Sequence, residues 1–172
     1  LDYENILISK LKMLFSSEFV NKMNSMMSDI NISKNLMEEY TNSEFSTKGF
    51  NVAVITNFIW NMSKYKKVEY PESLQKSMNN FTKFYNNKFK GRKLEWNNNI
   101  IHGEIVCHCF NKKYIFNASI YQIDILNKLN YSNTILFEDN VFMKSLLKLN
   151  ILKKVDDNVE INKDYKSKKI KQ

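Results

Sequence analysis

The stretch FTKFYNNKFKGRKLEW (residues 81–96) joins a helical pattern to a strand-like pattern at Gly91, one of three glycines in the 172-residue chain. Upstream, apolar residues recur at helical spacing as far as Phe89, and Pro71 followed by an acidic residue is typical of a helix start. Glycine adopts a positive φ without steric cost, so we expect Gly91 to end this helix. The residues KLEW that follow are expected to begin a strand.

Positive charge is concentrated around this stretch. The chain carries a net charge of +8, and residues 51–100 hold nine basic and three acidic side chains. Such a field attracts nucleic acid, a membrane surface or an acidic protein. No run approaches the roughly 20 apolar residues that span a bilayer, and two cysteines make no disulfide framework. We expect a soluble intracellular protein and, since the sequence begins with Leu1 rather than methionine, a fragment of a longer one.

Residues 1–40 carry a helical apolar pattern. Ser33 is expected to cap the start of a separate helix that runs to Tyr40, and the polar residues 41–49 are expected to form a loop. The apolar stripe that predicts the preceding helices consists of Leu7, Leu11, Leu14, Phe19, Met23, Met26, Met27 and Ile30.

The middle of the chain changes to a β pattern. Residues 52–60 are β-branched and aromatic with apolar side chains at both parities, which predicts a strand covered on both faces. The stretches GEIVCHCF (103–110) and KKYIFNASI (112–120) predict a hairpin that turns around Asn111 and Lys112.

The last third of the chain has the outline of a winged helix. Two short amphipathic helices are expected over residues 121–130 and 140–150, followed by two short strands within 151–162. We therefore predict an α+β protein with three parts. These are the end of a helical bundle (1–45), a small, antiparallel-rich α/β sheet domain (46–120) and a reduced winged-helix-like domain (121–172).

The motif HGEIVCHCF contains potential metal ligands and a potential acid–base pair. Strand alternation places Cys107 and Cys109 on one face and His108 on the other, whereas structural zinc takes four ligands. Glu104 and His102 have no accompanying nucleophile, and three glycines in the whole chain make a phosphate-binding loop hard to build. We expect no metal, no cofactor and no catalytic residues.

Nucleic-acid binding by a winged-helix module is the alternative function. The basic run 88–93 and the tail KDYKSKKIKQ (163–172) could contact phosphates, although a helix-capping cluster and a solvated linker explain them equally simply. The expected recognition helix, 140–149, carries only Lys144 and Lys148 and few side chains that read bases.

Residues 81–96 resemble the signature of the cullin family, in which a helix runs through an F-x-x-F-Y segment into G-R-K-L and a tryptophan. Further stretches similar to cullins follow in family order. They are EFVNKMNSMMSDINISKNL (18–36), NVAVITNFIWN (51–61), GEIVCHCFNKKYIFNASIYQIDIL (103–126) and YKSKKIKQ (165–172).

Three features depart from the family pattern. Trp60 is followed by Asn61 instead of proline, and the segment between Asn130 and Val141 is short for the helix that normally lies there. The sequence also ends at Gln172, before the final cullin domain with the lysine that a ubiquitin-like protein modifies, and it lacks the long N-terminal helical repeats. We therefore expect the turn after Trp60 to differ from that of other cullins.

The resemblance implies a non-catalytic scaffold of a multi-subunit ubiquitin ligase that supports substrate degradation in the cytoplasm and nucleus. In cullins the α/β domain takes an extended strand of a RING-box protein into a shared sheet. Adaptor and substrate receptor bind the N-terminal region that is missing here. The RING-box contacts implied for this sequence are Val52, Val54, Thr56, Phe58, Trp60, Leu94, Trp96, Val106 and His108. The residues expected to steer the acidic surface of a ubiquitin-conjugating enzyme are Lys88, Lys90, Arg92 and Lys93.

Overall fold

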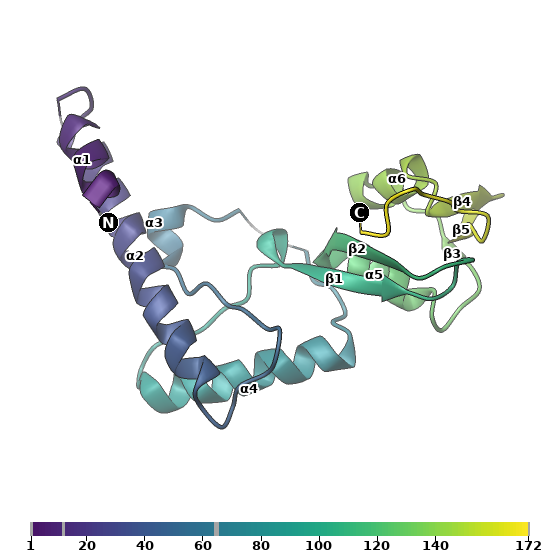
Figure 1. The fold of residues 1–172 in the computed structure, drawn as a ribbon, viewed down its shortest axis with the longest axis horizontal. Coiled ribbons are helices and arrows are strands. Elements are labelled where there is room, and N and C mark those ends of the chain that lie inside the picture. Colours follow the sequence, from purple (N-terminus) through teal and green to yellow (C-terminus); the bar gives the residue numbers. More distant parts are fainter. Residues whose placement is uncertain (1, 12, 64–65, 172) are drawn as a thin grey trace. The chain divides into compact units, whose positions relative to one another are not determined.

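The computed structural model describes residues 2–11, 13–63 and 66–171. The chain forms two compact units, a helical unit (residues 1–63 and 76–94) and a mixed unit (64–75 and 95–172). The predicted α+β class is confirmed, because the described residues contain six α-helices and two small antiparallel sheets (Figure 1). The domain boundaries expected after residues 45 and 120 stay predictions.

Aromatic packing holds the helical unit together. Its elements are α1 (Asp2–Leu11), α2 (Ser17–Thr41), α3 (Asn57–Trp60) and most of α4 (Glu72–Lys88). The C-terminal part of α2 crosses α4, and there Tyr40 and Phe81 are fully buried with ring centroids 5.0 Å apart (Figure 1). Two buried rings at this separation combine a large apolar area with a favourable ring–ring geometry. This crossing is the core of the helical unit.

The helix α2 is longer than expected. Its N-cap is Ser16, whose hydroxyl oxygen accepts a hydrogen bond from the Phe19 amide at 3.4 Å. The prediction that Ser33 caps a separate helix is wrong, because Ser33 lies inside α2 with its side chain buried. The expected apolar stripe is also only partly covered, since Phe19 and Ile30 are exposed. The buried face of α2 instead consists of Val20, Ser33, Leu36 and Tyr40.

The predicted helix before Gly91 is confirmed as α4. It ends at Lys88, three residues before Gly91, and Gly91 adopts the expected positive φ of 79° in the turn that follows. The prediction of a strand at KLEW is wrong, because these residues pair with no other strand in the described part of the chain.

The predicted strand over 52–60 is also wrong. Residues 51–56 belong to no helix or sheet, although Thr56 at their end is extended, and residues 57–60 form the short helix α3. Asn61 ends α3 in the left-handed region at φ 46°, where asparagine is more favourable than most residues. A proline could not adopt this φ, so the departure from the family's tryptophan–proline pair has a local structural reason.

The predicted hairpin is confirmed in the mixed unit as β1 (His102–Cys107) and β2 (Tyr114–Ser119), which pair antiparallel. On β1, a Cβ atom at Gly103 would lie 3.2 Å from the Ile123 side chain. The missing side chain therefore lets the hairpin approach the next helix closely. That helix, α5 (Ile120–Lys128), begins with a capping box between Ser119 and Gln122.

The C-terminal elements follow the order of helices and strands that is expected for a reduced winged helix. They are α5, β3 (Ile135–Leu136), α6 (Val141–Lys148), β4 (Leu152–Val155) and β5 (Asn158–Ile161), with sheet order β3–β5–β4. The short β3 was not predicted, and the described residues between α5 and α6 contain no helix. The Gln122 amide donates to the Ser145 hydroxyl at 2.8 Å and so links the two helices.

The basic tail is not a solvated linker. Tyr165 is buried, with its ring centroid 5.1 Å from those of Phe110 and Tyr114. The Ile115 amide donates to the Ile170 carbonyl at 2.9 Å, so the end of the tail lies along the edge of β2 that β1 leaves open. The tail is therefore an integral part of the mixed unit.

Candidate functional site

Residues 51–56, called the edge segment below, lie along α2 in place of a neighbouring strand. Every second amide of the segment donates a hydrogen bond to an α2 side chain. The acceptors are Met37 Sδ for Val52 (3.4 Å), Ser33 Oγ for Val54 (2.8 Å) and Asp29 Oδ2 for Thr56 (2.7 Å). Four helical residues rise about 6 Å, and two strand residues span about 6.6 Å. Acceptors spaced by four on a helix can therefore match donors spaced by two on an extended chain.

Asp29 joins α2 to both ends of α3. Its Oδ1 atom accepts from the Thr56 hydroxyl at 3.0 Å, and Oδ2 accepts from the Trp60 indole at 3.0 Å as well as from the Thr56 amide. Thr56 is the N-cap of α3 but gives no side-chain cap of its own. A single carboxylate thus fixes where the extended backbone ends and the helix begins.

The outer edge of the segment is unpaired. Alternate amides of an extended chain point in opposite directions, so the amides of Ala53 and Ile55 point away from the α2 acceptors. Neither donates a hydrogen bond within the part of the chain that the structure describes. Ala53 is exposed and Ile55 is half-buried. An open strand edge of this kind is a template for another extended chain.

The candidate contact residues of the helical unit lie on and beside this segment. Val52, Val54 and Thr56 are half-buried, whereas Phe58 on α3 is 83% exposed. Trp60 is half-buried and held by Asp29, so its indole N–H is already paired inside the chain. Leu94, beyond Gly91, is half-buried.

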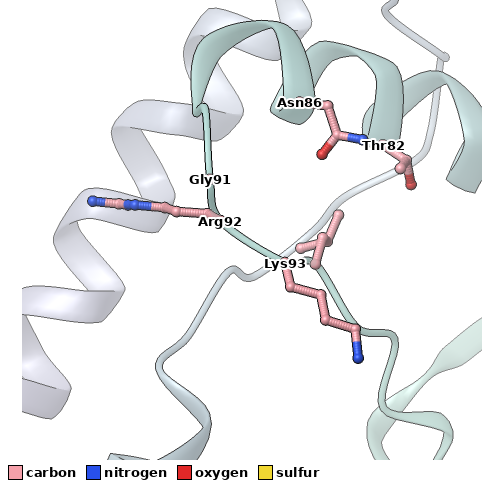
Figure 2. A pocket seen from close by; sticks show the side chains of 6 residues that line it. Thr82, Asn86, Gly91, Arg92 and Lys93 are labelled. Atoms are coloured by element: carbon pink, nitrogen blue, oxygen red, sulfur yellow. The ribbon is translucent and has the colours of Figure 1, made fainter.

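A hollow of about 330 Å³ lies beside Gly91, between the end of α4 and the residues that follow it. Thr82 and Asn86 line it from α4, and Figure 2 shows the Arg92 side chain directed away from both. The Thr82 hydroxyl already donates to the Met78 carbonyl at 2.8 Å. The charged and polar groups around the hollow therefore do not converge on a common point.

The four basic residues proposed from the sequence differ in their surroundings. Lys88 forms an ion pair with Glu39 of α2, and the Arg92 guanidinium lies 4.6 Å from the Phe89 ring centroid. Lys90 and Lys93 are exposed. An ion pair offsets the field of its cation, so Lys88 contributes less positive potential here than it would without Glu39.

In the mixed unit, three candidate contact residues lie on or near β1. Val106 is 44% exposed on β1, His108 is exposed directly after it, and Trp96 is half-buried. β1 pairs with β2 along one edge, and no described strand pairs with its other edge. This strand therefore offers a second open edge, within its own unit.

The two cysteines are poor candidates for chemistry. Burial, with a smaller contribution from neighbouring Cys109, raises the pKa of the Cys107 thiol to about 11. Burial also raises the pKa of Cys109. A thiol must lose its proton to act as a nucleophile or a metal ligand. Among the described residues no group of three or more His, Cys, Asp or Glu could hold a metal ion.

The winged-helix part gives little support to nucleic-acid binding. On α6 Lys144 pairs with Asp139, and on β4 Lys153 pairs with Glu160 at 2.9 Å. Lys154 lies over the Phe137 ring, 4.5 Å from its centroid. Cations paired in this way are less available for phosphate contacts.

Membrane spanning is a separate question. None of the described helices is long and apolar enough to cross a membrane.

Sequence reasoning missed Asp29 and Ser33. Asp29 was given no role, and Ser33 was expected to cap a helix, whereas both lie inside α2 at a spacing of four with Met37. Polar residues repeated at this spacing form a stripe along one face of a helix and require hydrogen-bond partners when they are covered. The polar spacing of Asp29 and Ser33 was therefore the feature of the sequence that could have indicated their role.

Comparison with known proteins identifies the chain. Residues 54–169 match the family model described as the cullin alpha+beta domain. Cullin-1 of Caenorhabditis elegans is 32% identical over 121 residues, which cover 67% of this chain and 16% of that protein. Cullin-1 of Schizosaccharomyces pombe is 27% identical over 197 aligned residues, covering 99% of this chain and 26% of that protein.

Cullin-1 of Dictyostelium discoideum is 29% identical over 148 residues, 80% of this chain and 19% of that protein. The chain belongs to the cullin family, as its resemblance to the family signature predicted. It spans between about a sixth and a quarter of the length of these relatives.

Proposed function

We propose that this protein is a non-catalytic scaffold of a cullin–RING ubiquitin ligase and that the edge segment captures an extended strand of a RING-box protein. The observation that carries the proposal is the open outer edge at Ala53 and Ile55, opposite an inner edge already held by α2. An incoming strand would form main-chain hydrogen bonds along that edge, and the side chains around it would supply specificity.

The proposed contacts in the helical unit are Val52, Val54, Thr56, Phe58, Trp60 and Leu94. Phe58 is the strongest apolar candidate, because a phenylalanine that is 83% exposed gains a large buried area when a partner covers it. In the mixed unit, the proposed contacts with the RING-box protein are Trp96, Val106 and His108.

The bound RING-box protein would recruit a ubiquitin-conjugating enzyme, whose acidic surface would be drawn toward Lys88, Lys90, Arg92 and Lys93. Electrostatic attraction of this kind raises association rates more than affinity. Adaptor and substrate receptor would bind the N-terminal region of the full-length cullin, outside this chain. The assembled ligase would act in the cytoplasm and nucleus, transferring ubiquitin to substrates for degradation.

Co-expression with a RING-box protein, followed by size exclusion with mass measurement, tests the proposal. We expect a 1:1 complex that persists at high salt, because main-chain hydrogen bonds and apolar contacts are weakly screened. We also expect the chain alone to self-associate at high concentration, since its open edges are then unprotected. Separate elution of the two proteins would contradict the proposal.

A further inference from the structure

We infer that Asp29 and Ser33 of α2 are positioning residues that set the register in which the edge segment captures its partner strand. The inference rests on the proposed function, because it concerns the same edge. Asp29 and Ser33 differ from the proposed contact residues, because they lie in α2 on the side of the edge segment opposite the captured strand.

The inner hydrogen bonds decide which amides face outward. Ser33 holds the Val54 amide at 2.8 Å and Asp29 holds the Thr56 amide at 2.7 Å, which leaves the intervening amides of Ala53 and Ile55 on the open edge. A shift of one residue along an extended chain moves every backbone group and side chain to the opposite side. The two acceptors therefore exclude the alternative register.

Asp29 and Ser33 should hold the edge segment more strongly than Met37, the third acceptor on α2. Ser33 is 5% exposed, so water cannot readily replace its hydroxyl as a partner of the Val54 amide. Asp29 accepts three hydrogen bonds with one carboxylate, and bonds to an ionised acceptor are the stronger class. Met37 offers a thioether sulfur, which is a weak acceptor.

The sharpest test compares Ser33→Thr with Ser33→Val in the 172-residue chain. Threonine and valine have nearly the same shape, so both variants add the same bulk to the buried site and differ in the hydroxyl. The probe is a labelled peptide with the sequence of the N-terminal strand of a RING-box protein, titrated at constant salt. We expect Ser33→Val to bind about tenfold more weakly than Ser33→Thr.

Asp29→Ala provides a second comparison at a half-buried site, with Glu38→Ala as its control on the same helix. Glu38 is an exposed carboxylate on the same helix, so the pair separates loss of the Asp29 bonds from loss of charge on α2. We expect about tenfold weaker peptide binding for Asp29→Ala and no change for Glu38→Ala.

Amide hydrogen exchange gives a readout that a merely structural role would not move. In the free chain the amides of Val54 and Thr56 should exchange slowly and those of Ala53 and Ile55 quickly, and peptide binding should slow the second pair. Ser33→Val should remove this alternation, and Ser33→Thr should keep it.

Equal peptide affinities for Ser33→Thr and Ser33→Val, with the alternation intact in both, would overturn the inference while leaving strand capture standing. Failure of the unchanged chain to bind either the peptide or the intact RING-box protein would overturn the proposed function and the inference together. The two failures are distinguishable because only the second affects the unchanged chain.

Discussion

The edge segment and the β1–β2 hairpin are built from similar residues but differ in what pairs their backbones. Both contain several β-branched side chains. In the hairpin each strand has the other as its partner, and β2 has the tail on its second edge. In the edge segment one side is held by α2 side chains and the other is open. Side-chain pattern thus predicts an extended backbone, whereas the number of available partners decides whether a sheet forms.

The largest contrast should come from proline at one alanine in each region. The Ile115 amide faces the tail, so the Ala118 amide faces β1, and Ala118 is buried. Ala118→Pro should lower the free energy of unfolding by about 3 kcal/mol, because it removes a ladder bond and crowds the strand. Ala53→Pro should change it by less than about 1 kcal/mol, since the Ala53 amide has no partner to lose. Urea unfolding of both variants measures the difference, and equal losses would remove the contrast.

Removing Asp29 should have the next largest effect. Asp29→Ala leaves the Thr56 amide and the Trp60 indole without their acceptor, so we expect a loss of about 1–3 kcal/mol in the free energy of unfolding. Glu38→Ala should change it by less than about 0.5 kcal/mol. In a Trp96→Phe background, a shift in the Trp60 emission should accompany Asp29→Ala alone. A loss as small as that of the control would show that α2 does not hold α3.

The sequence predicted those elements whose partners lie nearby in the chain. Pro71 and the apolar spacing located α4, and the turn around Asn111 located the hairpin. The two short helices α5 and α6 and the adjacent strands β4 and β5 lie where the sequence predicted them. The strand expected over 52–60 failed because its inner partner, Asp29, lies 27 residues before Thr56 and belongs to a helix. The prediction that Ser33 caps a helix failed for the same reason. A serine hydroxyl can cap a helix or accept a hydrogen bond from a distant amide, and the local sequence does not distinguish the two roles.

The candidate site was predicted only in part. The resemblance to cullins singled out residues 51–61, and Val52, Val54 and Thr56 lie along the edge segment within that stretch. The amides that face outward belong to the residues between them, Ala53 and Ile55. Parity could not be assigned from the sequence, because residues 52–60 are apolar at both parities and no periodicity distinguishes an inner from an outer edge.

Gly91→Ala should have a smaller effect than the preceding changes. The added Cβ would meet no atom within 4 Å, so the cost is the strain of an L-residue at φ 79°, about 1 kcal/mol. Gly91→Asn should recover part of this loss, because asparagine tolerates the left-handed region. Thermal unfolding of both variants provides the comparison. Equal stability of Gly91→Ala and the unchanged chain would show that the turn rearranges at no cost.

Charge reversal at the end of α4 should have the smallest effect. Lys90→Glu combined with Arg92→Glu should slow ubiquitin chain formation by the reconstituted ligase a few-fold at low salt and less at high salt, because screening weakens steering. Lys166→Glu with Lys168→Glu is the matched control on the tail. Rates that respond equally to both pairs, or that do not depend on salt, would contradict a specific role for the α4 cluster.

Binding of a RING-box protein to Ala53→Pro, compared with Ala53→Ser, tests the central claim most directly. Both variants replace an exposed residue, and only proline removes the outward amide. Capture at the open edge predicts that Ala53→Pro binds at least about tenfold more weakly than Ala53→Ser, while the two free chains unfold at similar urea concentrations. Equal affinity of the two variants would show that the partner strand does not use this edge.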